Sequence, residues 1–347
     1  MRPEPTRIEP IFSPRIWGAR SLAPLFPEKS NLAEPLGEAW LTGVDCRVAN
    51  GPFAGKTLGD AWREMPVEWR GTHLASTANF PLLVKFIFSN DKLSIQVHPD
   101  DAYAAAHEQA AGGRGKTEMW HAVSAEPGAR VLVGLKPGVD KEKFLRSLAA
   151  HTVENLFQAH EVKAGDTFFV PAGTPHTIGP GMALCEVQEY SDLTYRVYDY
   201  GRVDARGKPR ELHIEKALDV MNLGTAAGGK VLPAAIPGGA GSLLAACRYF
   251  AAERWDVPSP CGWQLDEAQF ELVVILSGTG ALGWKHGQEP YHGGECWMLP
   301  ATLETFAMNP SAPTVMLRTY VPDLAALRDA FRREGIVEHA LARVFFS

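Results

Sequence analysis

Three short segments of the chain carry side chains that could hold a metal ion. The first, "LSIQVHPDD", looks like a strand, and alternate residues of a strand share a face, so Gln96 and His98 should point the same way. The second, "GKTEMWH", offers Glu118, and the third, "AGDTFFVPAGTPH", ends on His176 after a tight turn. Nitrogen and oxygen donors of this kind suit a divalent transition ion such as zinc. Each residue alone could equally be an ordinary polar side chain on an exposed strand face or beside a turn.

The sequence "GRGKT" around Lys116 has the ending of a nucleotide phosphate-binding loop. That motif needs a glycine where Ala110 stands, and it must follow a strand and open a helix. Here a helix-like segment precedes it and a strand-like segment follows it. We therefore reject a phosphate-binding loop and expect Lys116 to share a strand face with Glu118.

A fourth segment, "CEVQEYSDLTYRVYDYGR", brings acids and bases together. It contains Glu186 on a strand-like stretch, followed by Asp192, Arg196 and Arg202. The arginines, with lysines from upstream, could form a cationic pocket for a small anionic substrate, because both side chains bind phosphate by charge-assisted hydrogen bonds. The alternative is ordinary surface ion pairing, which we favour for Arg202 and the basic residues after it. The lysines are Lys85 and Lys116, and the later basic residues are Arg206, Lys208 and Arg210.

The composition is that of a folded protein with a substantial core. The 347 residues are 46% hydrophobic and 21% charged, which suits two domains or one large one. The net charge of −6 argues against nucleic acid and membrane surfaces as partners. The chain starts without an apolar run, and no stretch of about 18 apolar residues could span a membrane. Five scattered cysteines without metal or redox spacing indicate buried thiols in a reducing cytoplasm.

Short apolar runs between glycine and proline turns predict a mainly β fold, either a sandwich or a barrel. The predicted strands include "PLLVKFIFS", "RVLVGLK", "DTFFVPAG", "MALCEVQEY", "ELVVILSG" and "PTVMLRTYV". Helices are fewer, and the predicted ones are "DDAYAAAHEQAA", "DKEKFLRSLAA", "ELHIEKALDVMN" and "DLAALRDAFRREG". We expect Asp100 and Asp101 to cap the first of them, Asp140 to cap the second, and Gly335 to end the last.

A Gly/Ala/Pro-rich segment, residues 223–242, has few packing residues and predicts a linker or a long exposed loop. It divides a metal-binding catalytic part, residues 1–222, from a smaller β-domain, residues 243–347. The sequence "GGECWMLPATLET" in the second part echoes "AGDTFFVPAGTPH" in the first but lacks its histidine. We therefore expect the second part to be structural.

The pattern of the third segment is similar to the second sequence motif of the cupins, which are small β-barrels of jelly-roll type. Together with "LSIQVHPDD", "GKTEMWH", "SDLTYRVYDYGR" and "LHIEKALDV", it closely resembles the short bacterial form of type I mannose-6-phosphate isomerases. The N-terminal "SPRIWGAR" and "LGEAWLTG" also look like that family, so the resemblance covers residues 10–222, and the C-terminal part fits only by the echo described above. It implies two cupin barrels, the second degenerate, with a few peripheral helices.

The resemblance also implies a cytoplasmic enzyme that interconverts mannose 6-phosphate and fructose 6-phosphate with one zinc ion per chain. Such a reaction needs a base that reaches two neighbouring carbons and positive charge beside the enediolate oxygens. Glu186 is the candidate base, Lys116 and Arg196 can stabilise the enediolate, and either Arg196 or Lys85 would hold the phosphate. The implied metal ligands are Gln96, His98, Glu118 and His176, the catalytic residues Lys116, Glu186, Asp192 and Arg196, and the substrate-binding residues Lys85, Ser94 and Arg202.

One position departs from the family pattern. Longer members carry a histidine just before the lysine, proposed for opening the sugar ring, whereas this chain has Gly115, so another group such as metal-bound water must do that step. Two other functions remain open, namely another metal-dependent cupin enzyme such as an iron dioxygenase, and a non-catalytic sugar-phosphate sensor. We expect a monomer or homodimer.

Overall fold

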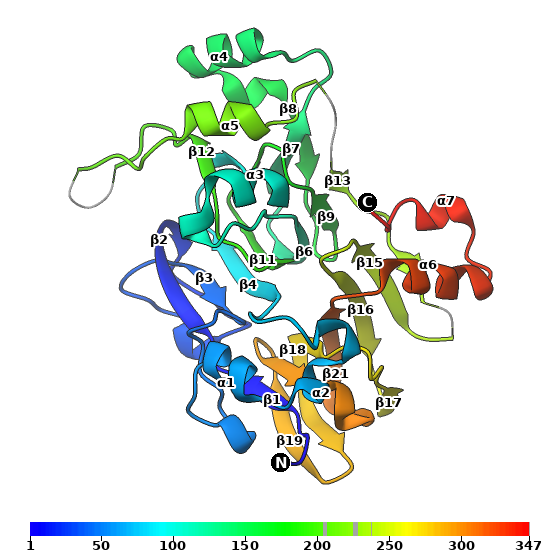
Figure 1. Ribbon diagram of the computed structural model, residues 1–347. Helices are drawn as coiled ribbons and strands as arrows, with labels where there is room; N and C mark the ends of the chain where they lie inside the picture. The colour runs from blue at the N-terminus through cyan, green and yellow to red at the C-terminus, as the bar shows by residue number, and fades with distance from the viewer. Residues whose placement is uncertain (204–206, 225–227, 237, 347) are drawn as a thin grey trace.

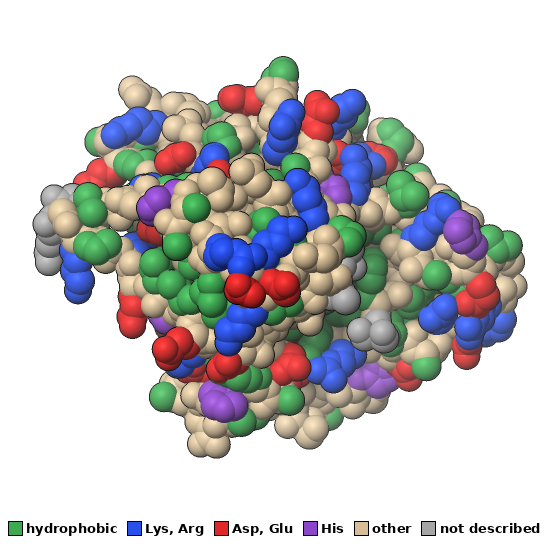
Figure 2. Space-filling view, turned by 90° about the horizontal axis from the view of Figure 1, so that it is seen from above, with side chains coloured by type: hydrophobic (Ala, Val, Ile, Leu, Met, Phe, Trp, Pro, Cys, Tyr) green, Lys and Arg blue, Asp and Glu red, His purple; other side chains and the backbone are tan. Residues whose placement is uncertain are grey.

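The computed structural model describes residues 1–203, 207–224, 228–236 and 238–346, which form a stack of antiparallel β-sheets with helices at its edges (Figure 1). The prediction of a mainly β protein is confirmed. None of the helices in these ranges is long and apolar enough to cross a membrane. On the face seen in Figure 2, the coloured basic and acidic side chains lie among one another and do not separate into patches of one sign.

Two facing sheets contain the predicted metal-binding segments. The seven-stranded sheet has, in order across it, β13 (Gly229–Lys230), β9 (Thr167–Val170), β6 (Glu118–Ala125), β11 (Met182–Glu189), β4 (Leu82–Ser89), β2 (Ile11–Ala19) and β3 (Leu36–Trp40). The five-stranded sheet has β12 (Tyr195–Tyr198), β5 (Ile95–Val97), β10 (His176–Ile178), β7 (Arg130–Leu135) and β8 (Phe157–Glu161).

Apolar side chains fill one end of the space between these two sheets, because alternate residues of each strand point inward. Trp120 and Leu184 come from the seven-stranded sheet, Val133 and Ile178 come from the five-stranded sheet, and all four are buried in one core. The polar candidate residues share these strands, so this core fixes the end of the sandwich where they stand. On the other side of the five-stranded sheet, α4 (Lys141–Ala149) and α5 (Ile214–Val220) cover a further core (Figure 1).

A nine-stranded sheet packs on the outer face of the seven-stranded one, through a core that includes Phe86, Val187, Leu272 and Leu317. Its main path is β1 (Thr6–Ile8), β20 (Cys296–Leu299), β18 (Glu271–Trp284), β21 (Thr305–Tyr320), β16 (Ala251–Val257), β15 (Gly241–Ala246) and β14 (Ala234–Ala235), with β17 (Cys261–Gln264) beside β21 and β19 (Gly287–His292) beside β18.

The predicted helices form, and the expected caps are present except at Asp101. Asp100 accepts a hydrogen bond from Tyr103 N at the start of α3 (Asp101–His107), and Asp140 caps α4 in the same way. Asp101 does not cap the helix as predicted, since its carboxylate accepts a bond from Gly115 N instead. The remaining helices are α1 (Leu58–Glu64), α2 (Val67–Arg70), α6 (Leu324–Arg333) and α7 (Glu338–Leu341).

The segment predicted as a linker, residues 223–242, takes part in both neighbouring sheets. Its strand β13 pairs with β9, its strand β14 pairs with β15, and Val231 and Ala234 are buried. Residues 225–227 and 237 of this segment lie outside the described residues. The domain boundaries stay a prediction. Strand β1 belongs to the first predicted part in sequence but pairs with β20 in the sheet of the second part.

The cysteines are free thiols. Cys46, Cys185, Cys247 and Cys296 are buried as predicted, but the prediction is wrong for Cys261, which is exposed on the edge strand β17.

Candidate metal centre and active site

Strand register places the candidate residues in two rows that face each other across the sandwich. In the five-stranded sheet, Gln96 of β5 is directly opposite His176 on one side and Arg196 on the other. In the seven-stranded sheet, Glu186 of β11 is opposite Lys85 on one side and Trp120 on the other. Ser94 and His98 flank β5 and Lys116 precedes β6, so of the residues predicted to share strand faces only Gln96 and Glu118 lie within their strands. The site lies at one open end between the two sheets.

His98, Glu118 and His176 converge on one point. Each offers a ligand atom, these atoms lie within 4.8 Å of one another, and all three side chains are buried. Glu118 Oε1 is 3.3 Å from His176 Nε2, and Glu118 Oε2 is 3.8 Å from His98 Nε2. The Gln96 amide lies 3.2 Å from His176 Nε2, so this predicted fourth ligand stands beside the other three.

The imidazole hydrogen bonds prepare both histidines to bind a metal. His98 Nδ1 lies 2.8 Å from Leu193 O, and His176 Nδ1 lies 2.8 Å from Thr174 O. A carbonyl oxygen can only accept, so each Nδ1 donates and each Nε2 presents a lone pair. Burial lowers the pKa of His176 to about 4 and holds that of His98 well below its usual range, so both rings are neutral at pH 7.

One oxygen of the Glu118 carboxylate is buried without a hydrogen-bond partner in the described part of the chain, as expected of a metal ligand. This oxygen, Oε1, faces the lone pair on His176 Nε2. Burial raises the pKa of Glu118 to about 8, even though Lys116 donates to its other oxygen. A carboxylate and two imidazole lone pairs facing one another repel unless a cation lies between them, and these donor types suit zinc. The residues therefore fit a divalent ion.

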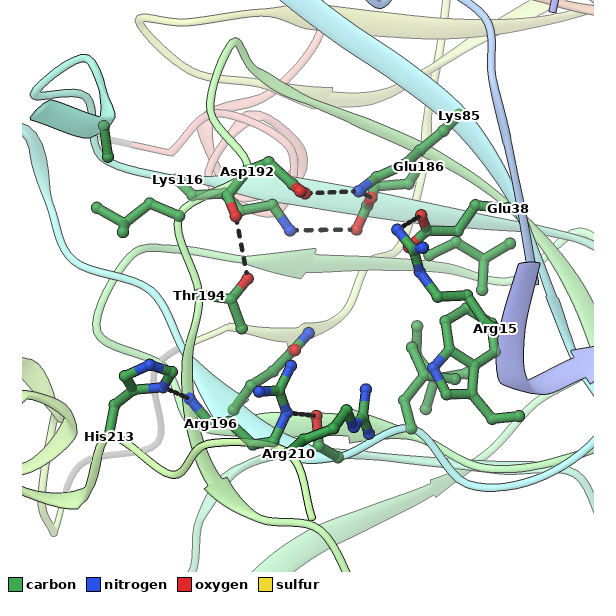
Figure 3. Close-up of a pocket in the computed structure, with 18 residues that line it drawn as sticks. Arg15, Glu38, Lys85, Lys116, Glu186, Asp192, Thr194, Arg196, Arg210 and His213 are labelled. Carbon is green, nitrogen blue, oxygen red and sulfur yellow. Dashed lines mark hydrogen bonds and ion pairs between the residues drawn. The ribbon is translucent and has the colours of Figure 1, made fainter. Parts of the chain in front are cut away.

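Beside the metal ligands, the Glu186 carboxylate lies between two ammonium groups (Figure 3). Its oxygens are 3.0 Å from Lys85 Nζ and 3.6 Å from Lys116 Nζ, and Trp120 Nε1 donates to it over 3.1 Å. Burial acts to raise the pKa of Glu186, but Lys116 and Lys85 outweigh it and lower the pKa below its usual range. Glu186 is thus ionised at neutral pH. Lys85 also pairs with Asp192 at 3.4 Å, and the two carboxylates raise its pKa well above the usual value despite burial.

A cavity of about 520 Å³ joins this group of charges to a second, cationic end (Figure 3). Arg196 and Arg210 stand at that end, well apart from Lys116 and Glu186, with Thr194 between them in the view. Arg196 Nε donates to Ser94 Oγ over 3.3 Å, and Arg196 makes no ion pair with a carboxylate of the described residues. Arg196 is therefore a half-buried cation whose charge remains available to a ligand.

The arginines that line the cavity beside Arg196 are not the ones predicted from the sequence. Arg202, predicted to bind substrate, is not among the lining residues in the described part of the chain, and it pairs instead with Asp199 at 2.7 Å and Asp91 at 3.3 Å. Surface pairing was the interpretation favoured for Arg210, which does line the cavity while its guanidinium binds Asp199. Arg206 lies outside the described residues.

Three ionisable residues that line the cavity were not predicted from the sequence. Arg15 of β2 pairs with Glu38 of β3 at 2.7 Å on one wall, and His213 lies beside Arg196 (Figure 3). Both members of the first pair lie inside the N-terminal segments "SPRIWGAR" and "LGEAWLTG", so those segments held a signal. His213 lies inside the segment "LHIEKALDV", so that segment held a signal too, although its Nδ1 meets the backbone N–H of Arg196 only through the fold.

Gly115, which stands where longer family members have a histidine, is required by close packing. A Cβ atom there would lie 2.6 Å from the carbonyl carbon of Asp100 and from the backbone nitrogen of Asp101. A histidine could not occupy this position without a shift of the start of α3.

The chain is similar to known proteins over most of its length. Residues 6–125 match the family described as phosphomannose isomerase type I, catalytic domain. The mannose-6-phosphate isomerase of Streptococcus mutans is 35% identical over 311 residues, covering 88% of this chain and 95% of its own. The chain belongs to the type I phosphomannose isomerase family.

Solved structures of this family have the same fold. The crystal structure of mannose 6-phosphate isomerase from Bacillus subtilis superposes with a TM-score of 0.81 at 29% identity, covering 91% of this chain and 99% of the other. A mannose 6-phosphate isomerase bound with zinc and yttrium superposes with a TM-score of 0.69 at 16% identity, covering 91% and 99%. At that identity the second likeness concerns the fold alone.

Proposed function

We propose that the chain is a zinc-dependent mannose-6-phosphate isomerase that interconverts mannose 6-phosphate and fructose 6-phosphate through an enediolate. The observation that carries the proposal is the ionised Glu186 carboxylate, held between Lys85 and Lys116 beside three converging metal ligands. A carboxylate so placed can move a proton between neighbouring carbons, and the adjacent positive charges can stabilise the enediolate oxygens.

His98, Glu118 and His176 would hold the metal, with Gln96 as the fourth ligand. The bound ion would supply a Lewis acid beside the substrate oxygens. The S. mutans relative is named a mannose-6-phosphate isomerase, which supports the reaction. One structural neighbour is a mannose 6-phosphate isomerase bound with zinc and yttrium, which is consistent with zinc as the metal.

The two ends of the cavity suit the two ends of the substrate. Arg196, with Ser94 at its Nε and Arg210 nearby, would bind the phosphate, because its guanidinium has no carboxylate partner among the described residues. The sugar carbonyl would then lie toward Glu186 and Lys116 at the opposite end (Figure 3). This assignment favours Arg196 over Lys85 as the phosphate ligand, since Lys85 is committed to Glu186 and Asp192.

The low pKa of Glu186 suits a carboxylate that becomes a stronger base when the substrate binds. Lys116 and Lys85 hold that pKa down in the free protein. Substrate oxygens that draw either ammonium group toward themselves would weaken this effect and raise the basicity of Glu186. Asp192, exposed at the cavity wall, would help to keep Lys85 charged during this exchange.

A coupled assay tests the function. The purified protein should convert mannose 6-phosphate to fructose 6-phosphate, lose the activity on chelation and regain it with zinc. Binding of mannose 6-phosphate without conversion in the presence of zinc would identify a sensor instead, and oxygen uptake with iron would identify an oxygenase. Analysis of the bound metal completes the test of the zinc assignment.

A further inference from the structure

The lysine of the candidate active site lies on a short segment that is fastened by hydrogen bonds on both sides. Gly115 N donates to Asp101 Oδ1 over 3.0 Å, and Thr117 N donates to Glu189 Oε1 over 2.7 Å. Both carboxyl groups therefore act on the backbone that carries Lys116. The lysine side chain is 3% exposed, so it has little room to adjust if this backbone moves.

Asp101 is itself held from the C-terminal part of the chain. Tyr249, in the turn between β15 and β16, donates from its hydroxyl to Asp101 Oδ2 over 2.7 Å. Arg248 Nη2 donates to the same oxygen over 3.1 Å and also to the Tyr249 hydroxyl. One carboxylate oxygen of Asp101 thus binds the lysine segment while the other binds the turn. We call Asp101, Arg248 and Tyr249 the Asp101 clamp.

The clamp acts on Gly115 through close packing as well as through a hydrogen bond. A Cβ atom on Gly115 would lie 2.6 Å from Asp101 N, so the two backbones are in direct contact. A displacement of Asp101 would therefore pass to Gly115 and to the neighbouring Lys116.

We propose that Tyr249 is a positioning residue, which fixes the Lys116 ammonium between Glu118 and Glu186 by holding Asp101. The inference rests on the proposed function, in which Lys116 stabilises the enediolate. It gives the C-terminal part, expected from sequence to be only structural, a part in the reaction. Because a displacement of about 1 Å can lower a rate by about a hundredfold, loss of one clamp hydrogen bond should be visible in turnover.

The first test is Tyr249→Phe, which removes one hydroxyl and leaves the ring. We expect kcat for mannose 6-phosphate to fall about tenfold while KM changes less than about twofold, since Arg196 and Ser94 are untouched. The matched control is Tyr320→Phe, because the Tyr320 hydroxyl donates to Glu253 over 2.7 Å inside the C-terminal sheet, apart from the clamp. This control should leave kcat unchanged. An equal loss of kcat in both variants would overturn the proposal.

A double-mutant cycle tests whether Tyr249 acts through Asp101. Asp101→Ala alone should lower kcat at least as much as Tyr249→Phe, and the double variant should lose no more than Asp101→Ala does. Additive losses would show that the tyrosine acts by another route and would refute the proposal.

Amide hydrogen exchange provides a readout that does not depend on turnover. The Gly115 and Thr117 amides should exchange about tenfold faster in Tyr249→Phe than in the wild type or in Tyr320→Phe. Faster exchange in a protein that fails to convert mannose 6-phosphate would support the positioning role and refute the proposed function. Unchanged exchange together with wild-type kcat would refute the positioning role and leave the proposed function standing.

Discussion

Replacing Glu189 by glutamine should make the stability of the protein less sensitive to pH. Glu189 is 5% exposed and accepts the backbone bond from Thr117 N. Burial, together with the neighbouring Asp101 carboxylate, raises its pKa to about 8 from an ordinary value of 4.5. At neutral pH the folded protein therefore keeps a proton on Glu189 that the unfolded chain has released.

Proton linkage gives the direction and the size of the change in the free energy of unfolding with pH. Between the unfolded and folded pKa values the native state binds more protons, so the free energy of unfolding falls as pH rises. The slope approaches about 1.4 kcal/mol per pH unit, which gives a loss of about 2 kcal/mol between pH 6 and pH 8 after allowing for partial ionisation at the upper end. Above the folded pKa the loss is complete and the slope vanishes.

Glu189→Gln keeps the shape and removes the ionisation. The introduced amide can still accept from Thr117 N through its oxygen and can donate toward Asp101 through its nitrogen. Urea unfolding at several pH values should show the variant losing about 2 kcal/mol less than the wild type between pH 6 and pH 8. Glu142→Gln on α4, where the side chain is 80% exposed, should follow the wild-type curve. Parallel curves for the wild type and Glu189→Gln would refute the protonated state assigned to Glu189.

Three further changes test the site. His176→Ala should lower zinc affinity by more than a hundredfold by removing a metal ligand, as measured by competition with a chelator, and affinity equal to wild type would exclude this residue from the metal centre. Glu186→Gln should lower kcat by about 10²–10⁴-fold with the metal still bound, because it replaces the base by an amide of the same shape; near-normal kcat would assign the base elsewhere. Arg196→Met should raise KM for mannose 6-phosphate at least tenfold in the coupled assay, and a loss confined to kcat would instead place Arg196 at the enediolate.

Features that depend on local sequence were predictable. The two-residue period of strands predicted that Gln96 and His98 point the same way, toward His176. Short-range capping predicted Asp100 and Asp140 at helix starts. These arguments need only a few adjacent residues. The convergence of His98 and His176 also needed the resemblance to a family, since spacing alone left a polar strand face as an equal alternative.

Features that depend on long-range register were not predictable. Arg202 and Arg210 lie at the two ends of a short basic segment, and nothing in their spacing indicates which of them reaches the cavity. The fold decides it, because the buried Asp199 carboxylate binds both guanidinium groups and only Arg210 also lines the cavity. Tyr249 could not be found either, since its hydroxyl meets Asp101 only after two sheets have packed.

The pairing of β1 with β20 has a consequence for biosynthesis. Thr6 pairs with Met298, so β1 must wait for a partner that the ribosome makes much later. In the finished sheet β1 covers the edge of β20, whose backbone groups would otherwise be open to pairing with another chain. Strand β1 thus protects the C-terminal sheet against aggregation, and affinity tags or deletions near it should be designed to leave Thr6–Ile8 free to pair.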